Sequence, residues 1–298
     1  MAAIADLNTQ LLDITDNRAI LKEVENIISL INPRFDFVYL DKVFNDVEKL
    51  FHGNYPGFRE CNTRYHDLRH TLTVFLAMAR LIHGAGLEGI NFTDKEINIG
   101  LIGSLMHDTG YIQQRDDSTG TGAKYTLVHI LRSIRFIQDY YKNDIYFRND
   151  LGDFADILNC TGFSIDIDKI VFSSLKMEIM GKILGTADLL GQMADRFYLE
   201  KLVYLFYEFD EARVPGFDSE IDLLRKTINF YNMTKSRFQK NLSNVNRFMI
   251  RHFEKRWQTN RNLYDEAIEK NINYLKYILK SNQKNISVCL RRNAITIQ

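Results

Sequence analysis

Proline and glycine are scarce in this sequence. Its 298 residues include only 3 prolines and 16 glycines, which is too few for the many tight turns of sandwiches, barrels and propellers. Apolar residues instead recur at three- and four-residue spacing along almost the whole chain, without convincing strand alternation. The composition and the spacing therefore predict an all-α, multi-helix bundle.

Cysteine is also rare. The chain has Cys61, Cys160 and Cys289, an odd number without any Cys-x-x-Cys pair. This usage argues against a disulfide framework and against a thiolate zinc site, and it is typical of a reducing compartment. The first residues also lack the basic and apolar regions of a signal peptide. We therefore expect a cytoplasmic protein.

Net charge and long apolar runs are absent as well. The 38 basic and 38 acidic side chains cancel, so no chain-wide field would attract a nucleic acid or an anionic membrane. No stretch of about 18 apolar residues is free of charge. Hydrophobic residues make up 45% of the chain, which excludes a disordered protein. We expect a globular protein with no nucleic-acid partner and no membrane span.

Capping residues and glycines indicate where helices begin and end. An apolar stripe over 65–79 predicts one helix, ended by the glycines at 84–86. Thr93 and Glu96 form a capping box for a helix over 94–107, and Ser219 caps another that reaches about 240. A loop is expected at 118–122. Asp168 could cap a long helical stretch over 168–212, with a break near 191–195. Further helices are expected near 18–31, 38–51, 124–141, 149–159, 244–256 and 259–280.

Histidine and aspartate occupy suggestive positions on these helices. His66 and His70 are four residues apart, so they are expected on one face of a helix. His107 and Asp108 are adjacent at the end of the next helix, and Asp188 lies in an otherwise apolar stretch. A carboxylate in such surroundings is costly unless it is paired or metal-bound. Two imidazoles and two carboxylates suit a divalent metal of borderline hardness and leave positions open for water and substrate.

The order of these residues resembles the HD-domain superfamily of metal-dependent phosphohydrolases. Residues 65–74, YHDLRHTLTV, look like the YHNxxHaxxV signature of the class I cyclic-nucleotide phosphodiesterases. Residues 105–110, LMHDTG, resemble their His-Asp segment, and 183–189, ILGTADL, resemble the segment with their last metal-binding aspartate. The resemblance covers about 60–195. It implies one domain over 1–298: an HD core at about 60–212, with helices from 1–55 and 218–285 packed on it or against a second copy in a homodimer.

The resemblance also implies the roles of individual residues. His70, His107, Asp108 and Asp188 would bind a divalent metal, which could be Zn, Mn, Mg or Fe. His66 and Asp108 would be catalytic: a metal-activated water would attack the phosphorus, and His66 would protonate the leaving alkoxide. The implied activity is hydrolysis of a phosphoester in a small nucleotide-like substrate, with a cyclic nucleotide as the specific case.

The sequence departs from the family pattern at several positions. Asp67 replaces the usual asparagine, and Tyr111 stands where phosphodiesterases carry a further histidine. His129 could bind phosphate or a second metal, or it could be a structural histidine. One metal is therefore expected, and the second stays open. The purine clamp of the phosphodiesterases has no clear match, so the substrate's identity does not carry over.

A second group of polar residues follows Asp188. In a continuous helix, Asp188, Gln192 and Asp195 would share one face. Gln192 could then contact the phosphate or base of a substrate, and Arg196 could pair with a phosphate. Support of the site through hydrogen bonds or ion pairs is the favoured interpretation of Gln192, Asp195 and Arg196.

Residues 247–261 mix basic and aromatic side chains. This mixture can bind single-stranded nucleic acid by stacking and charge. We favour an amphipathic helix with Phe248, Phe253 and Trp257 in the core, because the whole chain carries no net charge. His83 and His252 have no motif around them and are interpreted as structural.

Two other functions stay open. Some HD-domain proteins resemble mixed-valent di-iron oxygenases, and that chemistry would need two irons and more histidines than this pattern supplies. The chain could also be a non-catalytic HD module that senses a nucleotide without turnover. Metal binding with no product from any phosphoester would identify such a module.

Overall fold

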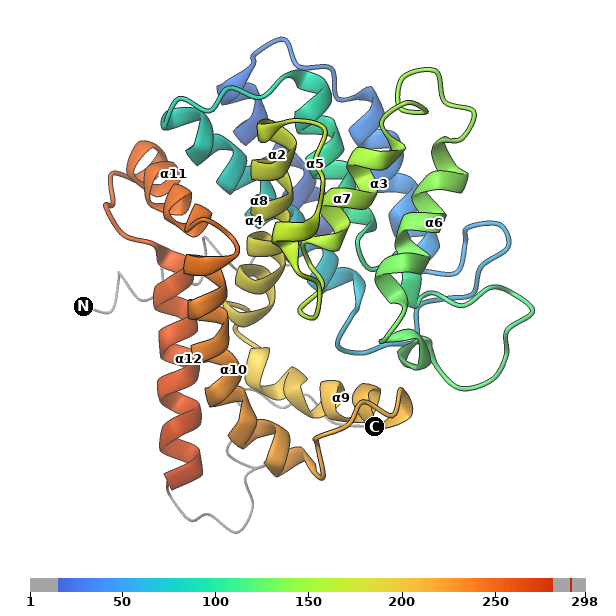
Figure 1. Ribbon diagram of the computed structural model, residues 1–298, viewed down its shortest axis with the longest axis vertical. Helices are drawn as coiled ribbons and strands as arrows, with labels where there is room; N and C mark the ends of the chain where they lie inside the picture. Colours follow the sequence, from blue (N-terminus) through green and yellow to red (C-terminus); the bar gives the residue numbers. More distant parts are fainter. Residues whose placement is uncertain (1–15, 281–289, 291–298) are drawn as a thin grey trace.

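A computed structural model describes residues 16–280 and Leu290. In this part of the chain all regular structure is helical: eleven α-helices and no strand (Figure 1). The prediction of an all-α, multi-helix bundle is confirmed. The helices are α2 (Asn17–Ile31), α3 (Val38–Phe51), α4 (Leu68–Leu87), α5 (Asp94–Met106), α6 (His129–Tyr141), α7 (Leu151–Asn159), α8 (Leu175–Met193), α9 (Tyr198–Glu211), α10 (Glu220–Lys240), α11 (Phe248–Trp257) and α12 (Leu263–Lys280).

Helix α4 is the centre of the bundle. It contacts α2, α5, α8 and α11, and nearly every side chain from His70 to Ala85 is buried. A helix that is apolar on all sides is stable only when other helices surround it. Helices α4, α5 and α8 also contact one another pairwise. Polar groups on these three helices therefore share one interior.

The C-terminal helices pack on this centre. Helix α11 lies against α4, and α12 contacts both α8 and α10, beside which it runs in Figure 1. Phe248 and Phe253 of α11 are buried as expected, while Trp257 is only partly buried against the core. The ends of the expected domain, at 1–15 and 281–285, lie outside the described residues, as does Cys289.

The start of α4 differs from the expected helix. Tyr65 and His66 lie before the helix, because Asp67 is its N-cap and accepts a hydrogen bond from the backbone N–H of His70 at 2.8 Å. Asp67, the departure from the phosphodiesterase pattern, thus has a local structural role. The expectation that His66 and His70 share a helical face is wrong. The glycines at 84–86 do not end α4 either, because the helix continues to Leu87. Gly84 instead lets the backbone of α11 approach α4, since a Cβ at Gly84 would lie 1.9 Å from the carbonyl oxygen of Phe248.

Two other helix starts were placed too early. Residues 122–125 form a short 3₁₀ turn, and α6 begins only at His129. Helix α8 begins after Ser174, whose hydroxyl accepts from the N–H of Met177, so Asp168 is not its cap. The break near 191–195 is present as a gap between α8 and α9. The capping box at Thr93 and the cap at Ser219 are both confirmed.

None of the helices in the described part of the chain combines the length and the apolar character that a membrane span requires.

Candidate metal centre

Four side chains from the three central helices converge in the interior. His70 comes from the first turn of α4, His107 and Asp108 follow the last turn of α5, and Asp188 comes from the middle of α8. His70, His107 and Asp108 are almost fully buried, whereas the side chain of Asp188 keeps 15% of its exposure. The four residues that the sequence predicts as metal ligands therefore lie together.

The donor atoms of these side chains are closely spaced. His70 Nε2 lies 3.3 Å from Asp108 Oδ2 and 3.3 Å from Asp188 Oδ1. His107 Nε2 lies 3.2 Å from Asp108 Oδ2, 3.9 Å from Asp188 Oδ1 and 3.4 Å from His70 Nε2. Ligand atoms about 2.1 Å from a tetrahedral metal lie roughly 3.4 Å from one another. The ligand atoms of His70, His107 and Asp108 all lie within 4.8 Å of one another, so these three residues could hold a single small cation, and Asp188 borders them through the two histidines.

Proton positions support the same interpretation. His107 Nδ1 lies 2.8 Å from the carbonyl oxygen of Ser104, which can only accept, so this nitrogen carries the hydrogen. In neutral His107 the lone pair of Nε2 then points at the cluster, as it does in metal-binding histidines whose other nitrogen is held by a carbonyl. Asp108 Oδ2 is buried and accepts no well-formed hydrogen bond. A cation would bind the lone pair of His107 Nε2 and the unpartnered oxygen Oδ2 of Asp108.

Charge is strongly coupled within the cluster. Burial lowers the pKa of His70, but interaction with Asp108 and Asp188 outweighs burial and raises that pKa to about 10. The pKa of His107 is also raised, since the Asp108 charge opposes burial there. Burial raises the pKa of Asp108, but the two imidazoles bring it well below its ordinary value. A divalent cation competes with protons for these atoms.

His66 lies beside the cluster and is held by a carboxylate that the sequence analysis missed. Its Nδ1 donates to Glu208 Oε2 at 2.6 Å, and its side chain keeps 15% of its exposure. The other oxygen of Glu208 accepts from the backbone N–H groups of Arg64 and Tyr65, at 2.8 and 2.7 Å. Glu208 is buried on α9 and fixes both the ring of His66 and the chain leading to it.

Tyr111 is the second residue whose role was missed. Its buried ring stacks between the rings of His66 and His129, with centroids 4.2 and 4.5 Å away. The Tyr111 hydroxyl is 3.4 Å from His66 Nε2, and burial raises its pKa well above the usual value. Tyr111 therefore lies as a neutral spacer between two imidazoles.

His129 faces the cluster from α6. Its Nδ1 donates to the carbonyl oxygen of Thr126 at 2.6 Å, and its Nε2 lies 3.8 Å from Asp108 Oδ1. Burial lowers the pKa of His129, which favours a neutral ring with a free lone pair on Nε2. This arrangement suits a ligand or a phosphate-binding group, and both roles stay predictions.

Gln192 has protein partners at both ends of its amide. Its Oε1 accepts from the hydroxyl of Tyr65 at 2.8 Å, and its Nε2 lies 3.5 Å from Asp188 Oδ1. Asp195 lies beyond the end of α8 and pairs with Lys201 at 3.6 Å. The helical face expected to carry Asp188, Gln192 and Asp195 therefore does not include Asp195. Arg196 lies near the ring of Phe197. Gln192, Asp195 and Arg196 thus contact other protein groups, as a supporting role in the site requires.

Comparison with protein families matches residues 55–248 to the Npun_R2479-like family. The chain belongs to this family. The Npun_R2479-like segment contains every residue of the cluster, from His66 to Glu208. A search of curated proteins finds no match.

Proposed function

We propose that this Npun_R2479-like protein is a metal-dependent phosphohydrolase of the HD type that cleaves a phosphoester of a nucleotide-like substrate. One observation carries the proposal: Nε2 of His70 and Nε2 of His107 each lie 3.2–3.9 Å from a carboxylate oxygen of Asp108 and from one of Asp188, with His66 fixed beside them. The local resemblance to cyclic-nucleotide phosphodiesterases makes a cyclic nucleotide the first substrate class to test.

The cluster would hold one divalent cation through His70, His107, Asp108 and Asp188. Such a cation supplies a Lewis acid for phosphoryl oxygens and makes a water more acidic near neutral pH. The side chains of Asp188 and His66 each keep 15% of their exposure, so both border the solvent side of the cluster. A phosphoester entering from solvent would therefore meet the donors and His66 together.

His66 would supply the proton for the leaving oxygen. Its Nδ1–H is held by Glu208 at 2.6 Å, so Nε2, which lies 3.4 Å from the Tyr111 hydroxyl, is the nitrogen that would face a substrate. In the imidazolium form, Nε2 gives its proton to the oxygen as the P–O bond breaks, while Nδ1–H stays on Glu208. A positioned acid of this kind contributes about 10²- to 10⁴-fold in rate.

The test combines metal analysis with a substrate panel. Purified protein is expected to bind about one equivalent of Zn²⁺ or Mn²⁺ and to hydrolyse members of a panel of cyclic and linear nucleotides and an aryl phosphodiester. His107→Ala is expected to lose both properties, and His52→Ala is the matched control, because His52 is exposed and its ring contacts the carbonyl oxygen of Glu48. Tight metal binding without any turnover would contradict the proposal and leave a sensing module.

A second candidate, an HD-type di-iron oxygenase, rests on the two oxygens of Asp108. Oδ2 faces His70 and His107, whereas Oδ1 lies 3.8 Å from His129 Nε2, as a carboxylate between two metals would. Tyr111 removes one further ligand from that second position. Two irons per chain and oxygen uptake would favour this candidate over hydrolysis.

We also propose a cytoplasmic location. It rests on cysteine usage: Cys61 and Cys160 are free thiols in the described part of the chain. Free, largely buried thiols are typical of proteins in a reducing compartment.

A further inference from the structure

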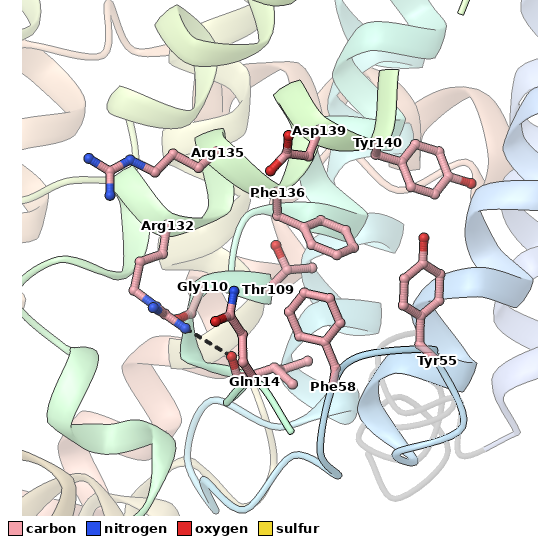
Figure 2. Close-up of a pocket in the computed structure, with 11 residues that line it drawn as sticks. Tyr55, Phe58, Thr109, Gly110, Gln114, Arg132, Arg135, Phe136, Asp139 and Tyr140 are labelled. Carbon is pink, nitrogen blue, oxygen red and sulfur yellow. Dashed lines mark hydrogen bonds between the residues drawn. The ribbon is translucent and has the colours of Figure 1, made fainter. Parts of the chain in front are cut away.

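A pocket of about 470 Å³ lies between helix α6 and the two loops that face it (Figure 2). One wall is the face of α6 that carries Arg132, Arg135 and Phe136. The other wall is formed by Tyr55 and Phe58 of the loop after α3 and by the segment 109–114. None of the donors of the candidate metal centre lines it. Its volume is typical of sites for small molecules.

Aromatic rings fill one part of this pocket. Phe58 and Phe136 pack edge to face with centroids 5.5 Å apart, and Tyr55 lies 5.9 Å from Phe136. Phe58, Phe136 and Tyr55 are only partly buried. Figure 2 shows these rings beside one another, with Tyr55 and Tyr140 at the end opposite the arginines. A planar ligand ring can therefore add to an existing aromatic cluster without displacing core residues.

Arginine side chains border the other end, where Arg132 lies beside Gly110 and Arg135 extends away from the rings (Figure 2). Arg132 is fixed, since its Nε and Nη2 donate to the carbonyl oxygens of Gly110 and Ile112 at 2.6 and 3.0 Å, and it lies over the ring of Tyr125. Its remaining N–H groups have no acceptor among the described residues. Arg135 is exposed and makes no hydrogen bond or ion pair within the described part of the chain. The fixed N–H groups of Arg132 and the unpaired charge of Arg135 favour the binding of an anionic group.

One acidic side chain opposes this charge. Asp139 also lines the pocket, but it is exposed and pairs with Lys142 at 3.3 Å. Two arginines against one aspartate leave the lining with a net positive charge. Neither arginine forms an ion pair with Asp139 in the described structure, so Asp139 does not neutralise the charge of either one.

We propose that this pocket binds a small aromatic anion: a planar ring against Phe58 and Phe136, and a phosphate or carboxylate at Arg132 and Arg135. A molecule that carries both a ring and an anionic group can contact the two ends of the pocket at once. Nucleoside monophosphates and simple aryl phosphates share this chemistry. The site is separate from the candidate metal centre and does not depend on the proposed hydrolysis.

The test is calorimetric titration of the full chain in EDTA, which removes any contribution of a bound metal. Phenyl phosphate is the probe, with phenol and inorganic phosphate as its halves, and adenosine 5′-monophosphate tests the nucleotide source. Phenyl phosphate is expected to bind one site at least tenfold more tightly than either half. Tighter binding of adenosine 5′-monophosphate than of phenyl phosphate would identify the ligand class as nucleotides. Tighter binding of phenyl phosphate would identify it as simpler aryl anions.

Charge variants locate the binding. Arg135→Gln is expected to weaken phenyl phosphate binding by about tenfold through loss of a charge-assisted contact. Asp139→Asn is expected to tighten it, and Arg148→Gln, an exposed arginine outside the pocket, should leave it unchanged. The side chains of Arg135 and Arg148 make no hydrogen bond or ion pair in the described part of the chain, so neither substitution removes a folding contact. Absence of binding, or equal affinity in all three variants and the unmodified chain, would overturn the proposal.

Discussion

Glu208 offers the most discriminating test of the proposed proton donor. Glu208→Gln keeps the shape of the side chain, and its amide oxygen can still accept from the N–H groups of Arg64 and Tyr65. The amide NH₂ of the variant must then face His66 Nδ1, which in the unmodified protein donates to the Glu208 carboxylate at 2.6 Å. Two donors cannot face each other, so the imidazolium of His66 loses its partner.

The expected loss depends on the leaving group. An alkoxide needs protonation, so its release should slow by about 10²-fold, the lower end for a positioned acid. A nitrophenolate needs little help, and its release should fall by less than about fivefold. Single-turnover hydrolysis of an alkyl and a nitrophenyl phosphodiester measures both rates. Metal content should stay unchanged, since Glu208 contacts none of the four donors.

Two control variants separate chemistry from folding. Glu208→Ala leaves three N–H donors without acceptors, at about 1 kcal/mol or more each, so it should lower the free energy of unfolding by at least about 3 kcal/mol. Glu211→Gln is the matched control on the same helix, because Glu211 binds the loop at Thr121. Equal rate losses for both leaving groups in Glu208→Gln would refute the reasoning.

Further predictions concern stability. His83 and His252 are buried with their Nδ1 atoms 3.1 Å apart, and burial lowers the pKa of His83 to about 4 and that of His252 well below its ordinary value. The unfolded chain binds protons below about pH 6.5 and the folded pair does not, so this stability is present above pH 6.5 and is lost on acidification. Denaturant unfolding in EDTA at pH 7 and 5.5 should show about 2–3 kcal/mol more acid loss than in His83→Gln/His252→Gln; equal losses would contradict the assignment. Gly110→Ala would place a Cβ 1.9 Å from the carbonyl oxygen of His129 and should cost about 3 kcal/mol, whereas Gly86→Ala, with nothing within 4 Å in a helix, should gain about 0.5–1 kcal/mol. The same unfolding assay measures both, and a tolerated Gly110→Ala would contradict the close packing of α6 on the segment after Asp108.

Local signals predicted the parts of the structure that local physics decides. The capping box at Thr93 and the cap at Ser219 lie where short-range hydrogen bonds set them. The position of His66 was misjudged because helical spacing alone was considered. Asp67, three residues before His70, is an N-cap signal, and it places His66 outside the helix.

The supporting residues of the site depend on contacts that are distant in sequence. Glu208 meets His66 across 142 residues, and its only sequence signal is a carboxylate within the aromatic run of 198–209. Tyr111 appeared in the sequence only as a departure from a family pattern, and its place between two imidazole rings needed the packing of α6. By contrast, Asp188 was identifiable, since a lone carboxylate in an apolar helix demands a partner.

We propose that His70, His107, Asp108 and Asp188 bind one catalytic cation. The most direct measurement is elemental analysis of the purified chain after equilibration with Zn²⁺ and Mn²⁺, read together with phosphodiester hydrolysis. The account predicts about one tightly bound metal per chain and measurable hydrolysis, both lost in Asp108→Ala and both kept in His52→Ala. A chain that binds no metal, or that loses none in Asp108→Ala, would contradict it.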